Sequence, residues 1–131
     1  MKQPRIPVWL DAAWPRMRSM RRALRYDGII PGKKNEDGTN EPMTPDDFRS
    51  MKDWIDEHRP TTSPFDIVRE GATPGDDREQ AAAAVQPFAE AGVTWWIEAV
   101  WKYFYRGTLE NMRTRIRQGP PPNSEERAPC L

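Results

Sequence analysis

Three acidic residues of this sequence each follow a short, largely apolar run, where a carboxylate could bind a ligand or exchange a proton: Asp11, Glu70 and Glu98. The run before Glu98, Val93–Ile97, consists of strand formers without a charge, which predicts a strand buried on both faces. Such strands belong to parallel sheets, which bind ligands at the carboxyl ends of their strands. We therefore expect the three carboxylates to gather at one rim with Pro31. A carboxylate pair could form there, and a hydrogen-bonding structural role for the two glutamates is the alternative.

Several other kinds of chemistry are excluded by the residue types present. Cys130 is the single cysteine and His58 the single histidine, so no internal disulfide, thiolate metal cluster or multi-histidine zinc site can form within one chain. His58 falls in the last turn of an expected helix, where a cationic imidazole favours the helix dipole. No expected strand is followed by a glycine-rich phosphate loop, a Walker sequence or a nucleophile elbow. We assign no catalytic residue.

The composition is that of one domain with substantial loop content. The 131 residues include 14 prolines, 37% hydrophobic and 31% charged residues, so part of the length must lie outside a core. Lys and Arg together number 20, as do Asp and Glu, and this balance argues against nucleic acid or an anionic membrane as the partner. No apolar run approaches about 18 residues, and no signal-peptide core follows Met1. We expect a cytoplasmic protein.

Strands and helices are expected to alternate along the chain. Strands are predicted at 6–10, 26–31, 65–71 and 93–98, and helices at 14–25, 44–58, 78–91 and 108–118. Thr44 gives a strong helix start and Gly92 a helix stop. Pro87 should kink its helix or restart it. Loops are predicted at 33–43, as a candidate lid, and at 99–107, with a disordered polar tail at 122–131.

Two of the expected helices are rich in arginine. Five arginines fall between residues 16 and 25. They could grip phosphates, but we favour a solvated face whose arginines pair with acidic neighbours. In the last helix Leu109, Met112 and Ile116 form an apolar stripe at helical spacing. The arginines among them are expected to face solvent: Arg113, Arg115 and Arg117.

The alternation predicts an α/β fold of four strand–helix units with a parallel sheet and right-handed crossovers, in one domain over residues 1–121. Four such units make either a small open sheet or half of an eight-unit barrel. The first and last strands would expose unpaired edges, which promote association.

The order of several motifs resembles the C-terminal half of the bacterial luciferase-like flavin-dependent oxidoreductases. These motifs, spread over residues 4–121, are Pro7–Leu10 with Trp14–Pro15, Arg21–Ala23, Tyr26–Pro31, Phe65–Val68, Glu70–Gly71, Thr73–Asp76, Ala89–Glu98 and Ile116–Pro121. The resemblance implies the C-terminal half of a TIM-type (βα) barrel and the coenzyme FMN or a related deazaflavin. It also implies monooxygenation with reduced flavin and oxygen, or hydride transfer, on a small organic substrate.

The resemblance further implies which residues would contact the flavin or the substrate. They are those at the predicted rim: Asp11, Ala12, Glu70, Gly71, Thr73 and Glu98. Asp11 and Ala12 stand where the family usually has a glycine pair, so side chains and a negative charge would crowd and repel a phosphate. The N-terminal units of the family have no counterpart here, so half of the site would be missing. The alternative is a non-catalytic half-barrel that pairs with itself, as a homo-oligomer, or with a complementary half-barrel.

Overall fold

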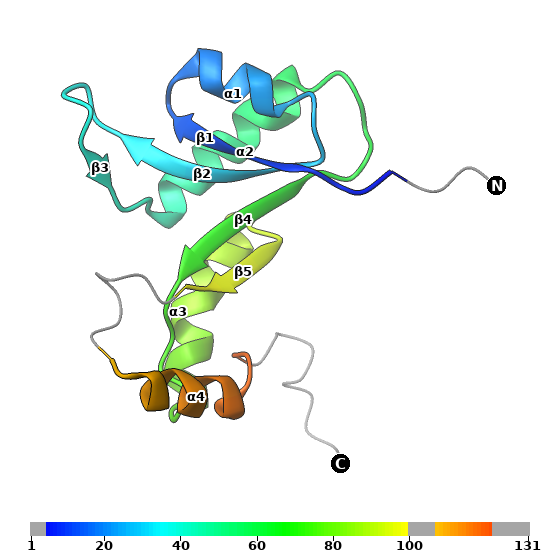
Figure 1. The fold of residues 1–131 in the computed structure, drawn as a ribbon. Coiled ribbons are helices and arrows are strands. Elements are labelled where there is room, and N and C mark those ends of the chain that lie inside the picture. The colour runs from blue at the N-terminus through cyan, green and yellow to red at the C-terminus, as the bar shows by residue number, and fades with distance from the viewer. Residues whose placement is uncertain (1–4, 100–106, 122–131) are drawn as a thin grey trace.

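The computed structural model describes residues 5–99 and 107–121, which form a mostly parallel sheet and four helices (Figure 1). The strands are β1 (Trp9–Trp14), β2 (Gly28–Lys34), β3 (Asn40–Glu41), β4 (Asp66–Gly71) and β5 (Trp95–Glu98). The helices are α1 (Met17–Ala23), α2 (Pro45–His58), α3 (Arg78–Glu90) and α4 (Leu109–Gln118). Strands β1, β2, β4 and β5 lie side by side in that order and run parallel, and β3 pairs antiparallel with β2. The expected α/β fold with a parallel sheet is confirmed.

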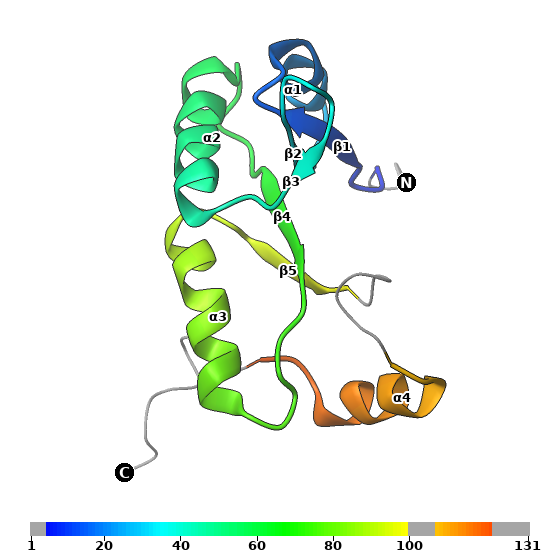
Figure 2. The same ribbon diagram turned by 90° about the vertical axis from the view of Figure 1, so that its left-hand side faces the viewer.

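The core lies between the sheet and the helices on one of its faces. Its fully buried side chains come from the strands β1, β2 and β4 and from the helices α1 and α2: Ala12, Ile29, Ile67, Met20, Ala23, Phe48, Met51 and Ile55. Helix α3 lies on the same side of the sheet as α2 (Figure 2), and its Phe88 meets Phe48 edge to face at 5.7 Å between ring centroids. Helix α4 differs from the others, because it lies across the carboxyl ends of β4 and β5.

The boundaries of α2, α3 and α4 follow the capping residues in the sequence. The side chain of Thr44 accepts a hydrogen bond from the amide of Asp47 (3.2 Å), and the carboxylate of Asp47 accepts one from the amide of Thr44 (2.9 Å). The side chains of Asp77 and Thr108 likewise cap α3 and α4. Gly92, at a φ of 99°, takes the left-handed conformation just beyond α3. The predicted starts of these three helices and the predicted stop at Gly92 are confirmed.

The first strand and the first helix start later than predicted. Strand β1 begins at Trp9, not Ile6, because its parallel pairing with β2 extends from there to Trp14. The peptide bond between Trp14 and Pro15 is cis, and α1 starts only at Met17. Pairing with a distant strand, and not the local apolar run, therefore sets the position of β1.

The predicted loop 33–43 is wrong in part. Strand β2 continues into this segment, and the chain returns antiparallel to it as β3. The amide of Asn35 closes the hairpin by donating to the carbonyl of Thr39 (2.9 Å). Lys33 lies 3.2 Å from the carboxylate of Asp47, so the hairpin is also tied to the start of α2.

Two predictions for the second half of the chain are also wrong. Strand β5 is not buried on both faces, since Trp95 is 53% exposed. The reason is that β5 is an outer strand, paired within the described residues only with β4. Helix α3 runs through Pro87, losing one backbone hydrogen bond there, so of the two predicted effects of Pro87 the restart is wrong and a kink stays a prediction. The predicted loop 99–107, except for its two end residues, and the predicted tail 122–131 lie outside the described residues.

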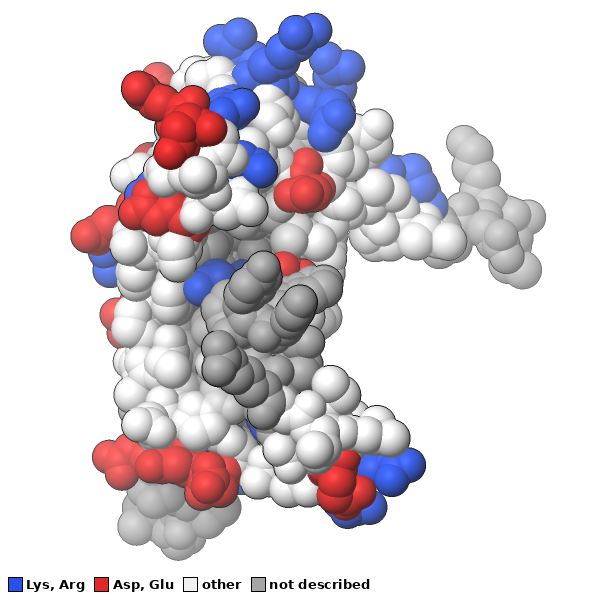
Figure 3. All heavy atoms as spheres, turned by 60° about the vertical axis from the view of Figure 1, so that its left-hand side comes forward, with Lys and Arg blue, Asp and Glu red and all other residues white. Residues whose placement is uncertain are grey.

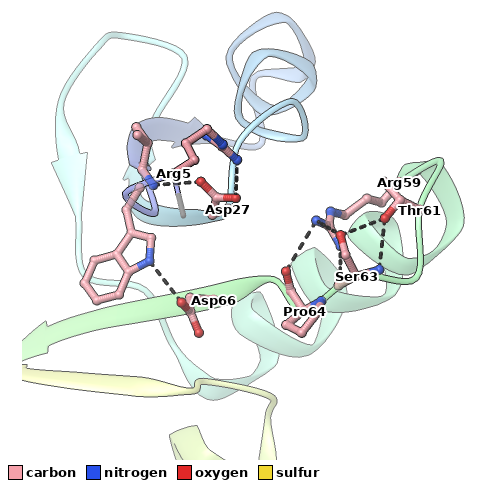
Figure 4. Close-up of polar contacts among 9 residues, drawn as sticks. Arg5, Asp27, Arg59, Thr61, Ser63, Pro64 and Asp66 are labelled. Atoms are coloured by element: carbon pink, nitrogen blue, oxygen red, sulfur yellow. Dashed lines mark hydrogen bonds and ion pairs between the residues drawn. The ribbon is translucent and has the colours of Figure 1, made fainter. Parts of the chain in front are cut away.

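The face of the sheet opposite α2 and α3 is concave near the N-terminal ends of its strands. Trp9 and Trp95 extend from β1 and β5, and their ring centroids are 5.6 Å apart. The indole of Trp9 donates to the carboxylate of Asp66 at 3.0 Å (Figure 4), and the indole of Trp95 donates to the other oxygen at 3.2 Å. Gly28 leaves room for this cluster, since a Cβ there would come within 2.6 Å of Trp9. Side chains of the two outer strands can meet in this way because the sheet curves around Asp66.

Candidate functional site

The carboxyl ends of β4 and β5 meet in a polar network. Gly71 and Glu98, the last residues of the two strands, are register partners, and the amide of Ala99 donates to the carbonyl of Gly71 (2.8 Å). One carboxylate oxygen of Glu98 accepts a hydrogen bond from the amide of Thr73 (2.6 Å), and the other accepts one from its hydroxyl (2.9 Å). Because Thr73 is buried, Glu98 fixes the start of the loop between β4 and α3.

Arg115 of α4 completes this network. Its Nε lies 3.3 Å from Oε1 of Glu98 and its Nη2 lies 3.3 Å from Oε2, which makes a bidentate ion pair. The guanidinium also donates to the carbonyl and hydroxyl of Thr73 (3.2 and 2.9 Å) and to the carbonyl of Gly119 (2.5 Å). Arg115 is only 8% exposed. Removing either charge would leave the other one poorly solvated, so the pair holds α4 against the strand ends.

Helix α4 thus contacts the sheet through an arginine and not through an apolar stripe. Leu109 is 63% exposed and Ile116 78% exposed, whereas Arg115 is buried. The prediction of a solvent-facing Arg115 is therefore wrong, and two residues of the predicted apolar stripe, Leu109 and Ile116, are exposed. Arg113 and Arg117 do face solvent. Arg115 is buried and the two apolar residues are exposed because α4 crosses the polar edge of the sheet instead of covering its apolar face.

A cavity of about 380 Å³ lies beside the ion pair, between β5 and the end of α4. Its apolar lining consists of Trp96, Met112, Ile116, Pro120 and Pro121, and its polar end is formed by Glu98 and Arg115. This volume falls within the range of small-molecule sites, about 300–1,000 Å³. An apolar lining with one polar end suits a flat ring that carries a few polar atoms.

The indole of Trp96 is held in place as one wall of this cavity. Its Nε1 donates to the carboxylate of Glu98 at 3.3 Å, and the ring of Phe88 lies 5.9 Å away between centroids. The guanidinium carbon of Arg69 lies 5.1 Å from the Phe88 centroid and 5.9 Å from that of Trp96. Burial lowers the pKa of the Arg69 guanidinium. Gly71 is required beneath the indole, because a Cβ there would collide with the Trp96 ring.

The cavity fits the ring of a flavin better than it fits the phosphate. Among the described residues that line it, Arg115 carries the only positive charge, and Glu98 offsets that charge. A phosphate placed here would meet no unpaired cation, whereas phosphate sites rely on charge-assisted hydrogen bonds. The residues present could therefore hold a ring, and a phosphate would need donors from another part of the protein.

The structure brings together three of the six residues predicted at the rim. Gly71, Thr73 and Glu98 are joined by the strand register and by the hydrogen bonds of the polar network. Asp11 and Ala12 are not at the carboxyl end of a strand, because β1 extends beyond them to Trp14, and β2 separates them from β4. The expectation of one rim is wrong for these two residues.

The remaining predicted positions also lie within strands. Ala12 is buried in the core against the helices, while Asp11 is exposed. Glu70 precedes the last residue of β4 and is half-buried, and strand alternation directs its side chain away from that of Gly71. Pro31 lies inside β2. Contact of the six candidate residues with a cofactor stays a prediction.

Trp96 and Arg115 are functional candidates that the sequence did not single out. Arg115 is one of several arginines on its helix, and its acidic partner is 17 residues away. The helix stop at Gly119, followed by two prolines that line the cavity, was the one local sequence signal that the end of α4 contributes to a site.

Comparison of this chain with protein-family models, with curated proteins and with solved structures gives no match. Within residues 5–99 and 107–121, no helix has the length and apolar character to cross a membrane. In the same ranges, no three His, Cys, Asp or Glu side chains are grouped so that they could hold a metal ion. His58 ends α2, and its ring stacks on Trp54 with 4.4 Å between centroids.

Proposed function

We propose that this chain forms the C-terminal half of a TIM-type barrel of the luciferase-like flavin-dependent oxidoreductases. The strand order supports this interpretation, because β1, β2, β4 and β5 are parallel and neighbour one another in sequence order, as barrel strands do. The helices α2 and α3 on one face and the concave opposite face support it as well (Figure 2). The rim between β4 and β5 would contact the coenzyme ring or the substrate.

The observation that carries this proposal is the position of the cavity at the carboxyl ends of β4 and β5. Barrel enzymes assemble their active sites at that end. The fixed indole of Trp96 offers a flat wall to the ring of FMN or of a deazaflavin, and Met112 and Ile116 supply apolar surface beside it. When bound, the coenzyme supplies hydride transfer or the reaction of reduced flavin with oxygen. The protein orients the ring and a small organic substrate.

Glu98 would position this site and would not serve as its base. Both carboxylate oxygens already accept hydrogen bonds from Thr73 and face the guanidinium of Arg115. A general base needs an oxygen within reach of the proton that it removes. The phosphate donors and any acid–base residue would belong to strand–helix units other than those described.

The proposal is tested by equilibrium titration of the full chain with FMN, oxidised and reduced, and with the deazaflavin. We expect quenching of flavin fluorescence in the oxidised titrations and a change in absorbance in the reduced ones. The Trp96→Leu variant should bind about tenfold more weakly or worse, since stacking on an aromatic ring contributes about 1–3 kcal/mol. Trp54→Leu is the matched control, because Trp54 stacks on His58 and does not line the cavity.

Two results would count against the flavin proposal. One is the absence of any spectral change with either coenzyme in either oxidation state. The other is equal binding by the wild type and Trp96→Leu, which would place the flavin elsewhere on the molecule.

A second candidate function is association without chemistry. It is favoured by the outer edges of β1 and β5, for which the described residues provide no strand partner. A folded protein that binds no flavin but forms an assembly larger than 15.2 kDa would support this candidate over the first.

A further inference from the structure

The two outer edges of the sheet match each other in length and direction. Among the described residues β1 pairs only with β2, and β5 only with β4, so each keeps one free edge. The end of β1 is already capped: the amide of Ala13 donates to Oγ of Ser19 (3.0 Å), and its carbonyl accepts from the amide of Arg16 (2.9 Å). The free part of β1 is therefore Trp9–Ala12, which is as long as β5, Trp95–Glu98.

The curvature of the sheet decides how two such edges can join. Trp9 and Trp95 touch across the concave face, so the four strands already bend toward each other at their start. All four strands run in the same direction, so the edge of β5 can continue the sheet by parallel pairing with the edge of a second β1. Two copies related by a two-fold axis could pair β5 of each copy with β1 of the other. The combined sheet would have eight parallel strands, the number that closes a (βα) barrel.

Exposed apolar side chains lie at the two edges that would meet. Ile6 is 80% exposed and Val8 38% exposed, and both precede β1, while Trp95 is 53% exposed at the start of β5. An ion pair of Arg5 with Asp27 (2.6 Å) and a bond from the amide of Val8 to the same carboxylate (2.7 Å) hold the segment before β1 against the turn before β2 (Figure 4). Parallel pairing would bring these starts of β1 and β5 together and remove their apolar surface from water.

Two clusters of opposite charge lie in different parts of the molecule. Exposed arginines of the α1 region form no ion pair within the described residues: Arg18, Arg21, Arg22 and Arg25. Exposed carboxylates gather instead at the start of α3, at Asp76, Asp77 and Glu79. Figure 3 shows blue side chains at the end that holds α1, with red ones beside them, and red ones at the start of α3, with both colours at α4. The opposite charges of these two clusters favour head-to-tail contact of two copies.

From these observations we infer that two copies of this chain associate by parallel pairing of β5 of each copy with β1 of the other, closing an eight-stranded barrel. Asp11 and Ala12 of one copy then lie beside β5 of the second copy, so each cavity at Trp96 is completed by the other chain. The partner of the free edges of β1 and β5 is thus a second copy of this chain, and the pairing does not depend on flavin binding.

Sedimentation equilibrium of the full chain tests the association. We expect twice the monomer mass of 15.2 kDa. Because alternate residues of a strand direct their amides to the same side, the amide of Asp11 points outward like that of Ala13. Asp11→Pro removes this donor and leaves the bonds to β2 intact, since edge strands tolerate proline there. It should raise the dissociation constant about tenfold or more, whereas Asp11→Asn, which keeps the amide, should still form the dimer.

A second variant tests the same interface without touching the strand. Reversing the charge of two exposed arginines in Arg18→Glu/Arg22→Glu should weaken the dimer, and added salt should weaken the wild-type dimer as well. If circular dichroism shows that Asp11→Pro is unfolded, the mass of this double variant decides whether the proposed interface forms the dimer.

Three results would overturn the inference. They are a wild-type mass of 15.2 kDa at all concentrations, open assemblies larger than two copies, and a dimer that neither variant weakens. A dimer without flavin binding would refute the proposed function alone, and flavin binding by a monomer would refute this inference alone.

Discussion

The indoles of Trp9 and Trp95 lie 5.6 Å apart between centroids, at an angle of 52°, although their strands form opposite edges of the sheet. Both donate to the carboxylate of Asp66, at the first position of β4. The hydroxyl of Thr94 approaches the same carboxylate at 3.3 Å. One side chain near the middle of the sheet therefore accepts hydrogen bonds from both outer strands and links them across its concave face.

Replacing Asp66 with alanine should destabilise the protein by about 1–3 kcal/mol, because the partly buried indole N–H of Trp9 would lose its acceptor. Asp66→Asn keeps one carbonyl oxygen and should lose less. Urea unfolding monitored by tryptophan fluorescence measures both changes. Equal stability of wild type and Asp66→Ala would show that the Trp9 and Trp95 contact does not depend on this carboxylate.

Glycine at position 28 should prove necessary where the sheet bends. A Cβ there would come within 2.6 Å of Trp9, 2.7 Å of the Asp66 carbonyl oxygen and 2.8 Å of the Asp66 Cβ. Gly28→Ala should therefore cost about 1–3 kcal/mol as overpacking. Gly32→Ala on the same strand is the control, since no atom lies within 4 Å of its added methyl group. Thermal unfolding compares the two variants, and a similar midpoint for both would contradict the crowding.

Removal of the Arg115 guanidinium should release α4 from the strand ends. Arg115→Met keeps much of the side-chain volume but leaves Glu98 and Thr73 without their partner, at a cost of about 1–3 kcal/mol. Arg117→Met changes a side chain that is 74% exposed and should alter stability by less than about 0.5 kcal/mol. Hydrogen exchange of the α4 amides, with urea unfolding, measures the difference. Unchanged protection of α4 in Arg115→Met would refute its role as the anchor.

Asp47 should make the stability of the protein depend on acid pH. Burial opposes the charge of its carboxyl, but hydrogen bonds from the Thr44 amide and the Lys33 ammonium outweigh it, so the pKa of Asp47 is lowered. A folded pKa below the unfolded value of about 3.9 adds stability above that pH, and this is lost as pH falls through the folded pKa. Urea unfolding from about pH 6 to 2 should show a smaller decrease for Asp47→Asn than for the wild type. Parallel curves would contradict this assignment.

Local sequence signals were sufficient for the order of the main elements. Thr44, Asp77 and Thr108 each cap a helix through the side chain that the sequence shows, and Gly92 ends α3 with a positive φ. Capping acts between residues two or three positions apart, so it can be predicted from neighbours alone. The order of strands and helices, and with it the parallel α/β sheet, could be predicted in the same way.

The sequence alone also marked Glu98 as the acidic end of an apolar strand, but only the tertiary structure decided what surrounds it. Arg115 looked like one of three solvent-facing arginines, and it became the buried partner of Glu98 because α4 lies across the strand ends. Asp11 looked like a strand end, and pairing with β2 placed it within β1. Helix caps and apolar periodicity depend on near neighbours, whereas strand register and buried ion pairs depend on residues that only the folded chain brings together.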